Sequence, residues 1–286
     1  MERLKTHVKL GLVVREEAEG LRQYVHISTG NYHNGTARLY EDLGVFSCEP
    51  ALAASVATVF NELTSAISFE DYGLLLVAPH NMRKRFTELI RREAEHQRAG
   101  RPSGIRVKLN QLQDPEIIRE LYEAARAGVP IILCVRGLCC LRAGVPGLSQ
   151  TIRVFSIVDR FLEHSRIYRF ENGGNPEFYL GSADWMHRNF ESRMETVAPV
   201  TDPAIQAELE QILDVYESDN TSAWDMQSDG HYVRRQPASG QPRREAQQLF
   251  VQLAAQALSS SAKRQGKIEI SESPPQADQP GGGVKG

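Results

Sequence analysis

Residues 164–185, HSRIYRFENGGNPEFYLGSADW, decide the fold. Two runs rich in aromatic and aliphatic residues flank the segment Asn172-Gly-Gly-Asn-Pro, whose residues favour turns, so the stretch predicts two strands joined by a turn. His164 and Arg166 stand two residues apart at the start of the first strand, so both side chains point to one face of it. A short polar segment that begins at Ser182 follows the second strand.

The same arrangement occurs near the start of the chain, in residues 7–31, HVKLGLVVREEAEGLRQYVHISTGN. His7 and Lys9 lead into a predicted strand at 10–14, a second strand follows at 22–27, and the polar segment begins at Ser28. With two such histidines, one imidazole can attack phosphorus while the other handles protons, and the cations hold the oxygens. A lone histidine is more often structural, but the repeat indicates a two-histidine site for phosphate chemistry.

The rest of the chain alternates between predicted strands and predicted helices, which indicates an α/β protein with a mixed sheet. Further strands are predicted at 74–79, 105–110, 129–135 and 153–158. Helices are predicted at 50–66, from an Asn81 cap to Ala99, at 114–128, from Thr201 onward, and at 242–258. Beyond Ser259 the sequence lacks the apolar residues needed to fold, so 259–286 is predicted to be a disordered tail.

The composition restricts the class of protein but does not indicate a binding partner. The chain has 286 residues, of which 41% are hydrophobic and 24% charged, and its net charge of -3 gives no argument for binding nucleic acid. No apolar run is long enough to span a membrane and the first residues, MERLKTH, do not form a signal peptide, so a cytoplasmic location is expected. The four cysteines lack the spacing of a metal or redox site.

Five segments carry a family resemblance: LKTHVKLGLVVR, STGNYHNGTARLY, VRGLCCL, SIVDRFLEHSRIY and GSADWMHRNFESRMETVAPV. Together they closely resemble the polyphosphate kinase family, which reversibly moves the terminal phosphate of ATP onto inorganic polyphosphate. The resemblance extends over roughly residues 3–260. It implies a phospholipase D-like mixed sheet with flanking helices, a phosphohistidine intermediate, and ATP and Mg²⁺ as the nucleotide substrate and its metal.

The resemblance also implies roles for individual residues. His7 is similar to the histidine that is phosphorylated, and His164 to the second histidine, which donates or accepts a proton on the opposite side. The residues that match phosphate- or nucleotide-binding positions are Lys9, Tyr40, Arg136, His164 and Arg193. A bidentate guanidinium suits phosphoryl oxygens better than a point charge does. Arg160 and Arg166 are weaker candidates, Asn31 and Asn34 are predicted to be turn residues, and Trp185 and Trp224 are predicted to pack.

The chain also departs from the family pattern. Residues 1–72 resemble the C-terminal half of a first phospholipase D-like domain, and residues 73–258 resemble a complete second one. The preceding part of the family, with the residues that bind Mg²⁺ there, has no counterpart, so no metal ligand is predicted in this chain. The expectation is a fragment with weak or no activity alone. The resemblance further implies ADP and polyphosphate as partners, a homo-oligomer at full length and a peripheral membrane association.

Two other classes of function remain open. A phospholipase D-type phosphodiesterase would hydrolyse a diester without ATP, but its signature requires an aspartate further along each strand, where this chain has Val14 and Glu171. A non-catalytic polyphosphate-binding module would keep the phosphate contacts without turnover.

Overall fold

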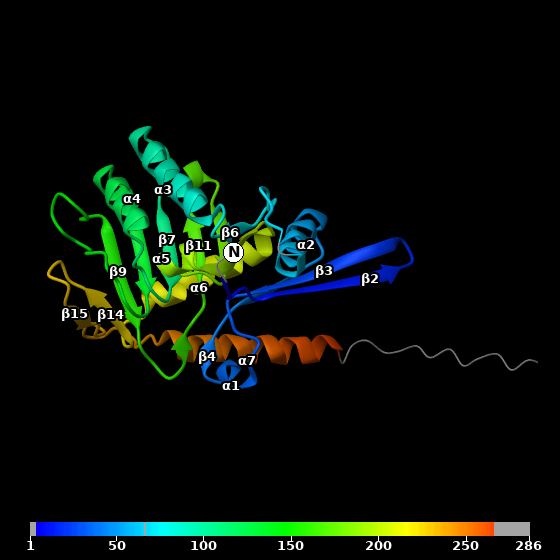
Figure 1. Cartoon of the computed structure of the whole chain (residues 1–286). Coiled ribbons are helices and arrows are strands. Elements are labelled where there is room, and N and C mark those ends of the chain that lie inside the picture. Colours follow the sequence, from blue (N-terminus) through cyan, green and yellow to red (C-terminus); the bar gives the residue numbers. More distant parts are fainter. Residues whose placement is uncertain (1–3, 66, 266–286) are drawn as a thin grey trace, which may run out of the picture. The chain divides into compact units, whose positions relative to one another are not determined.

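The larger sheet of the protein is mixed and lies in the first of two compact units, residues 1–247 and 248–286, into which the computed structural model divides the chain (Figure 1). The structure describes residues 4–65 and 67–265. The strand order is β1-β13-β12-β11-β7-β8-β9-β14-β15, and β6 also pairs with β13. These strands are β1 (Lys5–Thr6), β6 (Leu76–Ala78), β7 (Ile105–Leu109), β8 (Ile131–Val135), β9 (Ile152–Ile157), β11 (Ile167–Phe170), β12 (Glu177–Gly181), β13 (Arg193–Val200), β14 (Ala223–Met226) and β15 (Tyr232–Arg234).

Residues 164–185 lie near the centre of this sheet. β11 and β12 pair in antiparallel fashion, with Ile167 opposite Leu180, and the predicted turn between them contains the short helix η1 (Asn172–Gly174). Gly173 has a φ of 67°, a conformation that glycine adopts without a steric penalty. β11 then pairs antiparallel to β7, whereas β7, β8 and β9 are mutually parallel. The predicted α/β class, a mixed sheet with flanking helices, is confirmed.

The first copy of the motif forms a separate sheet, with strand order β2-β3-β5. Its strands are β2 (Leu10–Glu17), β3 (Gly20–Ser28) and β5 (Gly44–Ser47). The hairpin β2–β3 repeats the hairpin β11–β12, and each one follows a histidine and a cation and precedes a polar turn. A two-stranded parallel sheet, β4 (Tyr40–Glu41) with β10 (Leu162–Glu163), links the two copies.

Two apolar cores cover opposite faces of the central strands, because neighbouring residues of a strand point to opposite faces. Tyr168 and Tyr179 belong to the core beneath α3 and α4, whereas Ile167 and Leu180 belong to the core that includes α2 and α6. Figure 1 shows α3 and α4 side by side above the sheet, in agreement with their packing. The helices are α1 (Asn34–Ala37), α2 (Pro50–Ser65), α3 (Met82–Arg98), α4 (Pro115–Arg126), α5 (His187–Glu191), α6 (Pro203–Ser218) and α7 (Ala246–Gln265).

Two local predictions are wrong. Asn81 precedes α3 but does not cap it through its side chain; the amide instead accepts from Val77 N and donates to the Leu75 carbonyl, so it fastens β6. Residues 259–265, predicted to be disordered, continue α7, and residues 266–286 of the predicted tail lie outside the described residues. No helix in the described part of the chain is both long and apolar enough to cross a bilayer.

Candidate active site

The first histidine lies against strand β13, which comes much later in the chain. The backbone N–H of His7 donates to the carbonyl of Met194 at 2.9 Å, extending the parallel pairing of β1 with β13. This pairing brings the imidazole to Glu195, and His7 Nδ1 lies 2.8 Å and 2.9 Å from its two carboxylate oxygens. Glu195 is fully buried and also accepts hydrogen bonds from Ser182 Oγ and Asn189 Nδ2. The ring of His7 is therefore held in one orientation.

The other ring nitrogen of His7 faces Lys9. The Lys9 ammonium donates to His7 Nε2 at 2.9 Å and to the His7 carbonyl at 2.7 Å. Since an ammonium can only donate, Nε2 carries the lone pair, and the ring proton is assigned to Nδ1, which donates it to Glu195. The lone pair of the ring is thus on Nε2, and the Lys9 ammonium lies directly beside it.

Lys9 is a buried cation whose pKa depends on charges from both copies of the motif. Its side chain is 3% exposed, and burial lowers its pKa to about 8. Glu195 and Asp42 oppose this shift, and Arg166 and Arg193 reinforce it. Because these electrostatic interactions decay with distance, the two histidine centres share one electrostatic environment.

The second histidine repeats this arrangement. His164 Nδ1 lies 2.7 Å from Asp42 Oδ1, and Arg166 Nη1 lies 3.3 Å from His164 Nε2. Arg166 is also paired with Asp184 through two hydrogen bonds, from Nε to Oδ1 at 3.2 Å and from Nη2 to Oδ2 at 3.1 Å. Burial lowers the pKa of His164, whereas the hydrogen bond to Asp42 opposes that shift. Arg166 is therefore both a salt-bridge partner and a neighbour of the imidazole.

Each copy of the motif supplies the carboxylate that binds the histidine of the other copy. Ser182, in the second copy, donates to Glu195, and its oxygen accepts from Thr196 N at 3.1 Å; Glu195 then orients His7 of the first copy. In the first copy, Thr29 donates to Asp42, and its oxygen accepts from Leu43 N at 2.9 Å. Asp42 then orients His164 of the second copy. Each half of the site thus supplies the group that holds the other half's histidine.

Gly30 leaves room for the carboxyl group of Asp42, which binds His164. A Cβ atom at this position would lie 2.6 Å from the carboxyl group of Asp42, which is too close for any side chain. The glycine of the polar turn therefore allows Asp42 to approach, which is what the contact with His164 requires.

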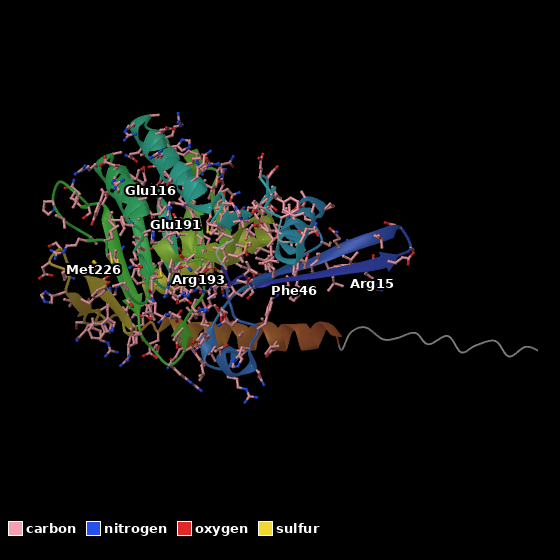
Figure 2. The ribbon with its side chains drawn as sticks, in the orientation of Figure 1. Arg15, Phe46, Glu116, Glu191, Arg193 and Met226 are labelled. Carbon is pink, nitrogen blue, oxygen red and sulfur yellow. The ribbon has the colours of Figure 1, made fainter. Side chains whose placement is uncertain are left out.

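The remaining predicted residues surround these two centres. Arg136 follows β8, and its Nε donates to Asn110 Oδ1 at 2.8 Å; burial lowers its pKa, and Arg166 adds to that shift. The ring of Tyr40 lies 5.0 Å from the ring of His164. Arg193, labelled in Figure 2, begins β13, and its Nη1 lies 3.9 Å from Glu195 Oε1. The structure therefore places Lys9 and Arg193 beside His7, and Tyr40 and Arg136 on the side of His164.

The minor candidates have plain structural environments. The guanidinium of Arg160 lies over the ring of Phe161 at 5.0 Å, with no contact to the imidazole of His164 among the described interactions. Asn34 begins α1. Trp185 is fully buried, as predicted, whereas Trp224 is 36% exposed and so packs only in part.

Sequence reasoning missed the two carboxylates and the amide that position these groups. Asp42, Glu195 and Asn110 do not stand out in the sequence, because acidic and amide residues are common in loops. One signal was present: Asp42 follows Thr29, and Glu195 follows Ser182, by the same interval of thirteen residues. A repeat that extends from the histidine through the hydroxyl to the carboxylate would have identified both.

The site fits phosphate better than it fits a metal ion. The described residues contain no cluster of histidine, cysteine and carboxylate side chains that could hold a metal, and Asp42 and Glu195 are each engaged by an imidazole and a hydroxyl. The groups around them are cations. No step is therefore assigned to a metal held by this chain.

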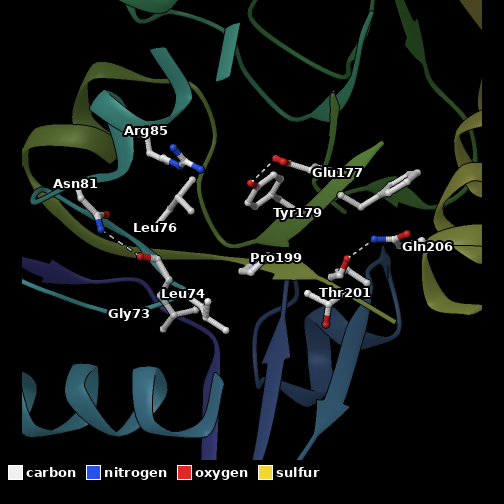
Figure 3. Close-up of a pocket in the computed structure, with 13 residues that line it drawn as sticks. Gly73, Leu74, Leu76, Asn81, Arg85, Glu177, Tyr179, Pro199, Thr201 and Gln206 are labelled. Atoms are coloured by element: carbon white, nitrogen blue, oxygen red, sulfur yellow. Dashed lines mark hydrogen bonds between the residues drawn. The ribbon is translucent and has the colours of Figure 1, made fainter. Parts of the chain in front are cut away.

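A large pocket lies elsewhere. Its volume is about 470 Å³. Figure 3 shows it between β6, β12 and the end of β13, with Arg85, Tyr179 and Gln206 in its wall. None of the residues predicted for the site lines it. Tyr179 donates to Glu177 at 2.9 Å there, and Gln206 donates to the Val200 carbonyl at 2.8 Å, so these polar groups are already paired.

The fold and the site together define an α/β protein with a mixed sheet and a repeated histidine–cation motif, in which each half supplies the carboxylate that binds the other half's histidine. Two family models match the chain: "Polyphosphate kinase C-terminal domain 1" over residues 1–69 and "Polyphosphate kinase C-terminal domain 2" over residues 75–247. The chain belongs to the polyphosphate kinase family.

Individual relatives agree with this assignment. The polyphosphate kinase of Thermosynechococcus vestitus is 55% identical over 241 residues, which are 84% of this chain and 33% of that protein. The Streptomyces coelicolor enzyme is 49% identical over 87% of this chain and 33% of its own length. The crystal structure of polyphosphate kinase from Porphyromonas gingivalis superposes with a TM-score of 0.84 at 36% identity, covering 91% of this chain and 40% of that one. The chain thus spans about a third of the length of these curated relatives.

Proposed function

We propose that this chain carries the two-histidine site of a polyphosphate kinase, which moves the terminal phosphate of ATP onto inorganic polyphosphate through phosphorylated His7. The crossed carboxylates support this proposal most directly, because they leave the lone pair of His7 on Nε2, beside a cation. The proposed substrates are ATP, ADP and polyphosphate, with Mg²⁺ brought by the nucleotide. A cytoplasmic location, a homo-oligomer at full length and a peripheral membrane association belong to the same proposal, as does the division at residue 72.

In the first step, His7 Nε2 attacks the γ-phosphorus of ATP. The N–P bond forms, the bond from the γ-phosphorus to the bridging oxygen breaks, and ADP leaves with the electron pair. Lys9 and Arg193 lie where they can neutralise the phosphoryl oxygens as charge develops. Glu195 stabilises the positive charge that the imidazole gains, through its hydrogen bond to Nδ1.

In the second step, a terminal oxygen of polyphosphate attacks the phosphorus of the phosphohistidine. An O–P bond forms, the N–P bond breaks, and its electron pair returns to His7 Nε2. His164, held by Asp42, is placed to exchange a proton with the entering or leaving oxygen. Arg136 can bind the phosphates on that side, and Tyr40 can contact the nucleotide beside the imidazole. Splitting the transfer in this way allows ADP to leave before polyphosphate enters.

The test of this proposal follows one covalent turnover, since turnover by this chain alone is expected to be weak or absent. The purified chain is incubated with ATP labelled in the γ-phosphate and Mg²⁺, or with labelled polyphosphate, and is quenched in alkali. An acid-labile phosphate that maps to His7 and is chased onto ADP supports the proposal. Polyphosphate binding that persists without any label indicates a binding module instead. Hydrolysis of bis-nitrophenyl phosphate without ATP indicates a phosphodiesterase.

Phosphate binding should weaken as the pH rises above about 8. A lysine whose pKa is lowered to about 8 is charged below that value and neutral above it, so the positive charge beside His7 is lost there. The same shift makes the free energy of unfolding rise with pH from about pH 8 to the ordinary lysine pKa, because in this range the unfolded chain binds one more proton at Lys9 than the folded chain does. Titration calorimetry with tripolyphosphate at pH 7 to 10 measures the effect.

The control for this pH effect is Lys9→Arg, in which the cation stays charged throughout the range. Its affinity for tripolyphosphate should change little between pH 7 and 10. Equal pH dependence in the wild type and in Lys9→Arg would show that another group is responsible.

A further inference from the structure

Among the residues whose burial the structure describes, Lys108 is the most deeply buried lysine that the site chemistry does not use. It lies on β7 with 1% of its surface exposed, and its ammonium donates to Ser165 Oγ at 2.7 Å and to Glu41 Oε2 at 3.2 Å. A second carboxylate, Glu163 Oε2, lies 3.2 Å away, and the ring of Tyr216 lies 4.8 Å from the ammonium. A buried charge is costly unless it is paired in this way, so its presence beneath the site needs an explanation.

The two carboxylates that contact Lys108 each precede a residue of the second histidine centre. Glu41 ends β4 and is followed by Asp42, whereas Glu163 ends β10 and is followed by His164. β4 and β10 pair in parallel over two residues each, and the flanking backbone bonds run from Leu162 N to Leu39 O at 2.9 Å and from His164 N to Glu41 O at 3.0 Å. Such a short pairing holds two strands weakly on its own.

The charges of this cluster favour the ionised cation. Burial would lower the pKa of Lys108, but attraction to Glu41 and Glu163 outweighs it and raises the pKa overall. Burial also opposes ionisation of Glu41, but the Lys108 charge and the Ser165 hydrogen bond lower its pKa overall. Glu163 keeps a raised pKa because of burial, despite Lys108. Removing the cation would leave the buried carboxyl group of Glu163 opposite the partly buried one of Glu41.

We infer that Lys108 is a positioning residue. Its contacts with Glu41 of β4 and Glu163 of β10 hold these two strands together and thereby hold Asp42 against His164. This inference rests on the proposed function, because it concerns the second histidine of that site. Its geometry does not depend on turnover, however: Ser165 Oγ donates to Glu41 at 2.7 Å as well, so Lys108, Ser165 and Glu41 form a closed set of contacts one residue away from the Asp42–His164 pair. If the set opens, Asp42 and His164 separate with their strands.

The decisive experiment is a nuclear magnetic resonance titration of the chain labelled with ¹⁵N-histidine, in which His164 is assigned by the loss of its signals in His164→Gln. The charged groups around this imidazole are Asp42, Arg166 and Asp184, and the ring of Tyr40 also faces it. In Lys108→Met we expect loss of the hydrogen-bonded Nδ1–H resonance. The midpoint of the titration should also move to lower pH, because the Asp42 contact that opposes the burial effect is gone.

Arg106→Met is the matched control. Arg106 lies on the same strand and, two residues away, on the same face, and it pairs with three carboxylates of α6, Glu210, Asp214 and Glu217. Its loss should lower the melting temperature and leave the His164 signals unchanged. If Lys108→Met does not fold, the double variant Lys108→Met/Glu163→Gln removes the repulsion while still lacking the link to Glu41 and Ser165.

The outcomes separate this inference from the proposed function. Wild-type His164 signals in a folded Lys108 variant, or the same change in Arg106→Met, would overturn the positioning role. A chain that never becomes labelled on His7 would contradict the proposed function, yet its His164 titration would still decide the role of Lys108.

Discussion

Replacing His7 with alanine should reduce covalent phosphorylation of the chain by three to four orders of magnitude, to background. The reason is that Nε2 of this imidazole is the proposed nucleophile, and removing a nucleophile leaves only binding and charge stabilisation. Neither Lys9 nor Glu195 can form an equivalent phosphoramidate with the same geometry. The measurement is the initial rate of acid-labile label from γ-labelled ATP, followed over times long enough to see one turnover.

His231→Ala is the control for this loss. Its imidazole is 85% exposed and pairs with Asp229 at 3.0 Å in a surface turn, so labelling should match the wild type. His7→Ala should keep the wild-type melting temperature to within a few degrees, since the side chain is 22% exposed and leaves no large cavity. Persistent labelling of a folded His7→Ala variant would assign the phosphate to another residue and remove the central step of the proposed reaction.

Much of the architecture was predictable because it depends on local patterns. The alternation within β11 and β12 and the glycine-rich turn between them specify a hairpin without reference to the rest of the chain. The Asp114-Pro pair predicts the start of α4, and Asp114 indeed accepts from Ile117 N at 3.1 Å. Asn81 was predicted wrongly because an asparagine before a helix can bind either the helix or the strand before it. Its side chain binds the backbone of Val77, in β6, and of Leu75, just before β6.

The site was predictable in its cations and imidazoles but not in what orients them. A histidine and a cation two residues apart on an extended segment must share a face, which is why the contacts of Lys9 with His7 and of Arg166 with His164 follow from sequence. The carboxylate that binds each Nδ1 does not follow from the sequence in this way. Asp42 and Glu195 reach the imidazoles only through pairing of β4 with β10 and of β1 with β13, so the contact depends on topology.

The same topology explains why the role of Lys108 does not follow from the sequence. Its partners Glu41 and Glu163 lie on different copies of the motif, and no local pattern shows that they converge on one strand of the main sheet. A lysine in a predicted buried strand is a local inconsistency, however, and such inconsistencies tend to mark functional regions. The lysine in the segment IRVKLN, residues 105–110, is such an inconsistency, and the strand periodicity alone does not show what it is for.

Changing Glu195 to glutamine should lower the rate of His7 phosphorylation by about three orders of magnitude while the chain stays folded. The carboxylate accepts the proton of His7 Nδ1; an amide nitrogen in its place would instead donate, so the ring proton would move to Nε2 and the lone pair needed for attack would be lost. Burial of an amide among Ser182 and Asn189 should cost about 1–3 kcal/mol of stability. A thermal melt checks that the effect is chemical.

Asp42→Asn makes the same replacement at the other histidine, and the comparison between the two variants is the sharper test. Since Asp42 orients His164, whose proposed role concerns protons on the entering or leaving oxygen, this variant should form the phosphohistidine faster than Glu195→Gln does. It should then be slow in passing the phosphate on to polyphosphate. Equal labelling rates in the two variants would mean that the carboxylates do not serve separate histidines, and the crossed arrangement would then have no functional consequence.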